Sequence, residues 1–139
     1  MAVEVKVLIS KNYVEDLFGL LKTGDNNKFF DKVADNVLWM VMGTHPLAGT
    51  YRSKDVFLEK TFQRLNKILR EGVILKVNNI IIGDDTAVIE MESLSTALNG
   101  MPFNNTYCWI VRFENDLIVE VRAYVDSALV QRIIDDNEK

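Results

Sequence analysis

Cysteine, histidine and proline are scarce in this chain, which has one Cys, one His and two Pro among 139 residues. A single Cys forms no disulfide framework within the chain, and one Cys with one His is too small a set for a zinc site or a His-rich metal cluster. We therefore expect no metal site and no disulfide-stapled scaffold. This cysteine usage favours a cytoplasmic location.

An excess of basic residues is also missing, because 16 Lys and Arg stand against 20 Asp and Glu. The resulting net charge of -4 gives no electrostatic attraction toward nucleic acid or an anionic membrane. Apolar runs such as Ile80–Ile82 are far shorter than the roughly 20 residues of a membrane-spanning helix. The first stretch, Met1–Ser10, carries Glu4 and Lys6 and does not resemble a secretory signal. Neither nucleic acid nor membrane is expected as a partner.

No Pro/Ser/Gly-rich linker, internal repeat or low-complexity segment divides the chain. A length of 139 residues with 48% hydrophobic side chains suits one compact domain with a buried core. We therefore expect residues 1–139 to form a single domain.

Helical signals fill the first half of the chain. Apolar residues recur at helical spacing, capping residues precede these runs, and glycines follow them. The elements expected there are a helix capped by Ser10, a short helix capped by Asp25, a buried strand over Val37–Met42, a loop over Gly43–Gly49 and a long helix from Ser53 to Gly72.

Strand signals fill the second half, where β-rich runs alternate with Gly, Asn and Asp turn residues. Short links between the runs favour antiparallel neighbours. The expected strands are Val73–Ile82, Thr86–Leu98, Asn104–Glu114 and Leu117–Val125, followed by a helix over Ser127–Ile134. This order predicts an α+β fold and excludes a Rossmann-type nucleotide-binding fold.

Two segments within this element order carry a family resemblance: GTHPLAG at Gly43–Gly49 and IVEVRAYVD at Ile118–Asp126. With them, the chain resembles the nuclear transport factor 2-like superfamily, in its SnoaL-like and ketosteroid-isomerase-like branch. The resemblance implies a cone-shaped, curved antiparallel sheet wrapped around helices, with a ligand pocket inside and a convex outer face used for homodimer formation. We expect Val121, Ala123 and Ile110 on that outer face.

The resemblance also implies a small-molecule pocket protein. One reading is a cofactor-independent acid/base enzyme, that is a cyclase, isomerase or lyase, acting on a hydrophobic ring-containing substrate. The alternative is a non-catalytic binding module for a hydrophobic small molecule. Ketosteroid isomerisation itself is not expected, because Leu17, a residue near Val41, and Trp109 occupy the positions of that enzyme's three functional residues.

Asp126 is the candidate catalytic base. Alternation along a strand places Arg122, Tyr124 and Asp126 on one face. On pattern alone this face can point to solvent, whereas the resemblance places the acid that ends this strand inside the cone. There Asp126 would take a proton and Tyr124 would orient a substrate oxygen. Because Asp126 directly precedes Ser127 at a helix start, helix capping is the alternative role.

His45, the one histidine, lies in the loop expected to rim the cavity, where it would assist Asp126 as a proton shuttle or bind a carbonyl oxygen. A loop histidine bonded to backbone is the alternative. The remaining ligand-binding candidates are Trp39, Met91, Tyr107, Trp109 and Arg122. Such a lining favours a flat, ring-containing or terpenoid-like molecule over a sugar phosphate, which needs several converging Lys or Arg side chains.

Overall fold

The computed structural model describes residues 8–138. Most of Met1–Ser10, on which the argument against a secretory signal rests, therefore lies outside the described residues. The helices are α1 (Lys11–Gly19), α2 (Asn26–Phe30), α3 (Lys54–Lys60), α4 (Phe62–Asn66) and α5 (Ser127–Asn137). The strands are β1 (Val33–Val41), β2 (Gly49–Tyr51), β3 (Leu75–Gly83), β4 (Thr86–Ser93), β5 (Ser95–Thr96), β6 (Pro102–Phe103), β7 (Thr106–Glu114) and β8 (Leu117–Val125).

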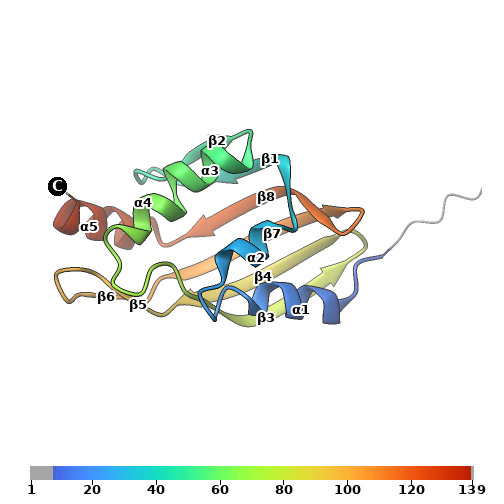
Figure 1. The fold of residues 1–139 in the computed structure, drawn as a ribbon, viewed down its shortest axis with the longest axis horizontal. Helices are drawn as coiled ribbons and strands as arrows, with labels where there is room; N and C mark the ends of the chain where they lie inside the picture. Colours follow the sequence, from blue (N-terminus) through green and yellow to red (C-terminus); the bar gives the residue numbers. More distant parts are fainter. Residues whose placement is uncertain (1–7, 139) are drawn as a thin grey trace, which may run out of the picture.

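One six-stranded sheet in the order β2-β1-β8-β7-β4-β3 forms the frame, and α1 to α4 cross one of its faces (Figure 1). The pairs β3–β4, β4–β7 and β7–β8 are antiparallel, as the short links predicted. The strand β1 joins β8 in parallel and β2 in antiparallel fashion. The predicted α+β fold is confirmed, but its sheet is mixed and not antiparallel throughout, because β1 runs parallel to β8.

The helix starts follow local chemistry. The hydroxyl of Ser10 accepts a hydrogen bond from the Tyr13 N–H at 3.1 Å, and Ser53 accepts one from the Val56 N–H at 3.2 Å. Each bond satisfies a backbone donor that has no partner within the first helical turn. The predicted caps of these two helices are confirmed.

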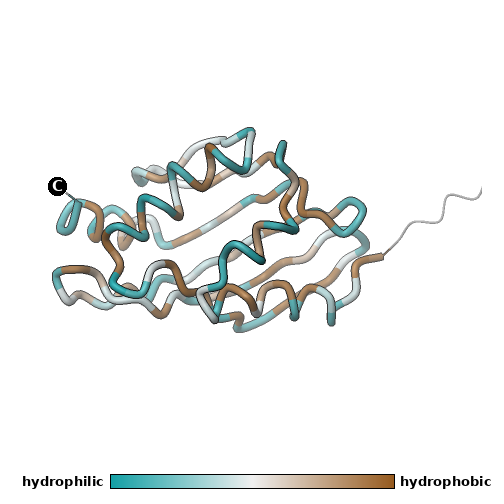
Figure 2. Tube along the Cα trace, viewed as in Figure 1, coloured by the Kyte–Doolittle hydropathy of each residue, from teal (hydrophilic) through white to brown (hydrophobic). Residues whose placement is uncertain are grey.

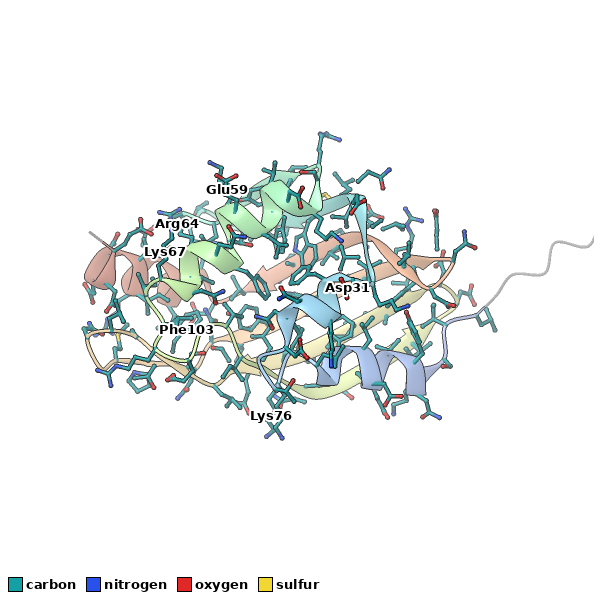
Figure 3. All side chains as sticks on the ribbon, in the orientation of Figure 1. Asp31, Glu59, Arg64, Lys67, Lys76 and Phe103 are labelled. Atoms are coloured by element: carbon teal, nitrogen blue, oxygen red, sulfur yellow. The ribbon has the colours of Figure 1, made fainter. Side chains whose placement is uncertain are left out.

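The long helix expected from Ser53 to Gly72 is interrupted at Thr61, which has φ −123° and ψ −81°. The Thr61 hydroxyl donates to the Phe57 carbonyl at 2.6 Å, a local bond that bends helices. The segment therefore forms α3 and α4 instead of one helix. Exposed charged residues such as Glu59 and Lys67 project from the outer side of α3 and α4 (Figure 3).

The core fills the space between these helices and the sheet. Hydrophobic positions recur on the strands and on the covering helices (Figure 2). On β8 the buried residues are Val121 and Ala123, whereas Arg122 and Tyr124 are exposed. The prediction that Val121 and Ala123 lie on the convex face is therefore wrong. Burying an apolar side chain is favoured by roughly 25 cal/mol per Å² of surface removed from water, so the apolar set of this strand turns inward.

Within residues 8–138, no helix combines the length and the hydropathy that crossing a membrane requires.

Candidate functional site

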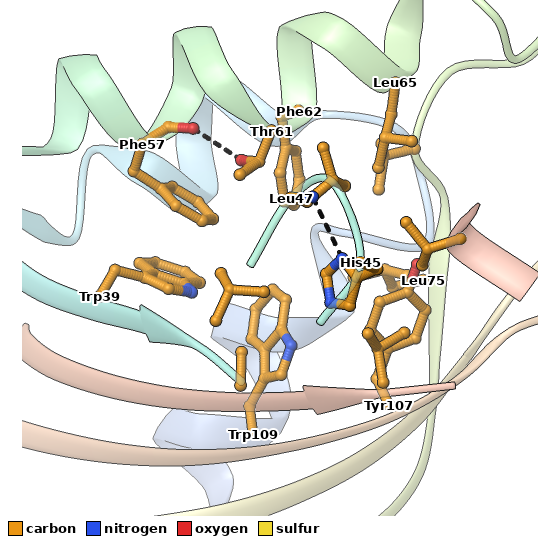
Figure 4. Close-up of a pocket in the computed structure, with 15 residues that line it drawn as sticks. Trp39, His45, Leu47, Phe57, Thr61, Phe62, Leu65, Leu75, Tyr107 and Trp109 are labelled. Atoms are coloured by element: carbon orange, nitrogen blue, oxygen red, sulfur yellow. Dashed lines mark hydrogen bonds between the residues drawn. The ribbon is translucent and has the colours of Figure 1, made fainter. Parts of the chain in front are cut away.

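A pocket of about 50 Å³ lies between the inner face of the sheet, α3 and α4, the loop after β1, and α5 (Figure 4). Because one water needs roughly 10–15 Å³ by this measure, the pocket has room for roughly four water-sized groups, about one small ring. Its aromatic lining consists of Trp39, Phe57, Phe62, Tyr107 and Trp109, and most other lining residues are aliphatic. Within the described chain, no Asp, Glu, Lys or Arg side chain lines this pocket.

The aromatic wall is built on neighbouring strands. Trp39 of β1 stacks on Phe57 of α3, with ring centroids 3.9 Å apart and planes 15° from parallel. The same Trp39 meets Trp109 of β7 edge to face at 5.1 Å and 85°. These are favourable geometries for aromatic pairs. Ala123 of β8 lies between β1 and β7 as the register partner of both Val41 and Trp109, and its small side chain leaves space above the sheet.

His45 lines the pocket, but its own loop uses both ring nitrogens. Nδ1 accepts a hydrogen bond from the Leu47 N–H at 3.1 Å, and Nε2 lies 3.1 Å from the Met42 carbonyl. The first bond requires an unprotonated Nδ1, so the proton of the neutral ring is on Nε2 and is donated to Met42. Burial lowers the pKa of His45, and the bond to Met42 opposes this in part. In this arrangement His45 holds the loop and has no free nitrogen for proton transfer.

Asp126 does not face the pocket. Its Oδ1 accepts hydrogen bonds from the N–H groups of Ala128 and Leu129, at 3.1 and 3.4 Å, and the residue is exposed at the start of α5. The prediction that Asp126 points into the cone is wrong. Asp126 caps α5, and the apolar side chains of β8 turn inward, so the polar side chains of that strand turn outward with Asp126.

Tyr124 and Arg122 share the outer face with Asp126. The Tyr124 side chain is 45% exposed, and Arg122 is exposed as well. Neither residue lines the pocket. The predicted contribution of Tyr124 to catalysis and of Arg122 to ligand binding in this pocket is therefore also contradicted.

The structure does bring Trp39, Tyr107 and Trp109 together in the pocket wall. Met91 is buried on the inner face of β4 as the register partner of Tyr107, but it does not reach the pocket. Sequence reasoning missed Phe57, although Phe57, Thr61 and Leu65 recur at a spacing of four residues and mark the inner side of α3 and α4. The binding of a ligand by these residues stays a prediction.

Tyr107 contributes a phenol to the pocket. Burial raises its pKa well above the usual range, and the neighbouring Ser93 hydroxyl opposes this in part. The phenol therefore stays protonated at neutral pH and acts as a hydrogen-bonding group, not as a base. Among residues 8–138 no three His, Cys, Asp or Glu side chains gather in a metal-binding arrangement.

No family model matches the chain. A dimerizing cyclase, phiC, from a fungal species is 31% identical over 134 residues, which cover 94% of this chain and 59% of that protein. A second dimerizing cyclase, tstC, from Talaromyces stipitatus is 35% identical over 102 residues, which cover 70% of this chain and 45% of that protein. The chain thus spans about half the length of the curated relatives it matches.

Solved structures share the fold. An NTF2-like protein from Burkholderia thailandensis has a TM-score of 0.75 at 24% identity, covering 88% of this chain and 95% of that one. A cystatin-like-fold protein of unknown function from Xanthomonas campestris has a TM-score of 0.74 at 20% identity, with the same coverage of both chains. A protein with a ketosteroid-isomerase-like fold from Catenulispora acidiphila has a TM-score of 0.65 at 13% identity, covering 84% of this chain and 86% of that one.

Fold and pocket together define the class: an α+β domain with an apolar cavity between its sheet and its helices. The chain has the fold of nuclear transport factor 2-like and ketosteroid-isomerase-like proteins, as its sequence predicted.

Proposed function

We propose that the chain is a small-molecule pocket protein of the SnoaL-like type that acts as a cofactor-independent cyclase on a hydrophobic, ring-containing substrate. The observation that carries this proposal is the aromatic pocket between the sheet and the helices, which has no charged side chain in its lining. The curated relatives named as cyclases support the reaction class. Because the chain matches about half of their length, the activity is proposed for this chain and not inherited from them.

Cyclisation suits the pocket because positioning supplies much of the rate enhancement. Aromatic walls formed by Trp39, Phe57 and Trp109 would hold a flat, flexible substrate with its reacting carbons in contact, and would exclude water. With no carboxylate in the lining, the attacking carbon must be acidic in the substrate itself. When that carbon joins a carbonyl carbon, the proton it has lost ends on the new alkoxide oxygen. The step is an isomerisation that needs neither oxidant nor reductant.

A ligand screen tests the proposal. We expect small, single-ring polyketides or terpenoids to raise the melting temperature of the protein, and we expect Trp109→Ala to abolish the shift. Tyr124→Ala is the matched control, because Tyr124 lies on the outer face. Mass spectrometry of each stabilising compound after incubation then detects a cyclised isomer. Stabilisation by sugar phosphates and by no apolar compound would show that the pocket is assigned wrongly.

The second candidate is a non-catalytic binding module for a hydrophobic small molecule. It is favoured by the state of the pocket's ionisable groups, since both His45 nitrogens are engaged and Tyr107 stays protonated. A compound that stabilises the protein and is recovered unchanged, including at alkaline pH where the substrate ionises more easily, would support this candidate over the cyclase.

Self-association through the outer face of the sheet is a further part of the proposal. Ile81, Val88 and Ile110 are successive register partners on β3, β4 and β7, and Ile81 is 55% exposed. The word "dimerizing" in the relatives' names has two meanings. If it describes the protein, it supports a protein dimer. If it describes the reaction, it means that two substrate molecules are joined. Light scattering separates the two meanings. A dimer that Val88→Lys dissociates and Glu59→Lys, on the outer side of α3, leaves intact supports the interface, and a stable monomer at micromolar concentration contradicts it.

A further inference from the structure

The chain has two tryptophans, Trp39 and Trp109, and both lie in the pocket wall. The Trp39 side chain is fully buried, and its Nε1 has no hydrogen-bond partner among residues 8–138. Trp109 is 3% exposed and lines the pocket next to it. In Figure 4 the nitrogen of each indole lies on a ring edge turned toward other lining residues.

An unpaired buried N–H is unusual, because the great majority of buried polar groups in folded proteins have a partner. An indole nitrogen only donates, so the missing partner of Trp39 is an acceptor. The indole of Trp109 meets Trp39 edge to face in the same pocket wall. The unpaired donor of Trp39 therefore points to an acceptor supplied by a ligand, with a second indole N–H beside it.

The other side chains of the pocket restrict which kind of acceptor group a ligand can place there. The His45 ring is occupied by Leu47 and Met42, and the Thr61 hydroxyl donates to the Phe57 carbonyl. With no Lys or Arg in the lining, a carboxylate or phosphate placed here would be a buried, unpaired charge. A neutral oxygen acceptor on an apolar ring avoids that penalty.

We propose that the indole N–H groups of Trp39 and Trp109 form the polar recognition site of the pocket, and that the group they recognise is the carbonyl oxygen of a ring ketone. This inference rests on the proposed function, because the ketone is then the electrophilic carbonyl of the cyclisation. The same N–H groups would stabilise that oxygen as it gains negative charge.

Indole ¹H–¹⁵N spectra of the uniformly labelled chain test the proposal directly, since two tryptophans give two indole signals. The probes are cyclohexanone and methylenecyclohexane, which have nearly the same shape and differ in C=O against C=CH₂. Their single ring matches the pocket's size. We expect cyclohexanone to move at least one indole proton downfield, and we expect loss of the indole N–H groups to weaken its binding about ten-fold, as one hydrogen bond to an unpaired buried donor supplies.

Two control proteins assign the effect. Replacing both tryptophans by 3-benzothienylalanine keeps the bicyclic shape but removes each N–H, so it should weaken the binding of cyclohexanone and leave that of methylenecyclohexane unchanged. Tyr107→Phe removes the other nearby donor and should leave the affinity for cyclohexanone unchanged. An affinity for cyclohexanone that falls in Tyr107→Phe and not with benzothienylalanine overturns the proposal.

The remaining outcomes separate this inference from the proposed function. If both probes bind, benzothienylalanine changes neither affinity and the indole protons do not move downfield with cyclohexanone, the recognition site is wrong while the hydrophobic pocket stands. If neither probe binds, both the recognition site and the pocket function are refuted.

Discussion

Acidification should loosen the loop that covers the pocket, because its conformation depends on a neutral His45. The ring is buried and bridges the Met42 carbonyl and the Leu47 N–H, each at 3.1 Å. A proton added to Nδ1 would face the Leu47 N–H donor to donor. The charged ring would therefore lose that bond and favour exposure to water.

The direction of the pH effect follows from the lowered pKa. His45 has a pKa below the usual 6.5 in the folded protein, so the unfolded chain takes up the proton first. Its contribution to stability is complete above about pH 6.5 and decreases as the pH falls below that value. The decrease is at most about 1.4 kcal/mol per pH unit for one proton, and it ends at the folded-state pKa.

Urea unfolding at about pH 7.5 and about pH 5.5 measures this linkage, and the chain has no other histidine to confuse it. His45→Asn is the matched variant, since an Asn side chain can accept from the backbone N–H two residues on without titrating. We expect His45→Asn to lower the free energy of unfolding by about 1 kcal/mol, because the hydrogen bond to the Met42 carbonyl is lost. We also expect the free energy of unfolding to lose its dependence on pH in this variant. His45→Ala should cost about 2–3 kcal/mol, because it leaves both backbone groups unpaired.

Two results would refute this reasoning. One is a wild-type protein with the same free energy of unfolding at both pH values. The other is a His45→Asn variant that keeps the wild-type pH dependence, which would assign the titration to another group.

Three further predictions concern other parts of the chain. Asp126→Ala should cost about 1 kcal/mol in urea unfolding and Asp126→Asn almost nothing, because Asn caps as well as Asp; loss of turnover in Asp126→Asn would contradict the capping role. Asn105 is buried, and its Oδ1 accepts hydrogen bonds from the backbone N–H groups of Thr106 and Asp126 at 2.8 and 3.1 Å. Asn105→Ala should therefore lower the free energy of unfolding by about 2–4 kcal/mol. A decrease below about 0.5 kcal/mol, the effect of an ordinary surface substitution, would show that these hydrogen bonds contribute little. Burial and the Glu90 carboxylate raise the pKa of Cys108, so this thiol should react with iodoacetamide more slowly than free cysteine at about pH 8, and equal rates would refute it.

The features predicted correctly from the sequence are set by short-range chemistry. Ser10 caps α1 because its hydroxyl reaches a backbone N–H three residues away. Gly72 has φ +74°, a left-handed conformation that favours glycine. Asn115 and Asp116 both have positive φ, as the tight turn between β7 and β8 requires. None of these features depends on how distant segments meet.

The features that were missed depend on long-range contacts. The parallel pairing of β1 with β8 joins Val41 to Ala123, which no local signal specifies. The break at Thr61 is ambiguous in sequence, since threonine also occurs inside helices. The alternation of Val121, Ala123 and Val125 leaves either direction open for the polar face of β8, and the resemblance favours the inward direction, which the structure contradicts.

The direction of β8 decides what chemistry the pocket can perform. A shift of one residue in strand register would exchange its two faces and turn Arg122 and Tyr124 toward Trp109. The charge of Arg122 would then be buried against aromatic rings with no carboxylate in the lining to pair with it, at a cost of several kcal/mol. The apolar face of β8 inside the pocket is therefore strongly specified by the sequence. A pocket built on it supplies shape, exclusion of water and N–H donors, so the acidity that the proposed cyclisation needs must come from the substrate.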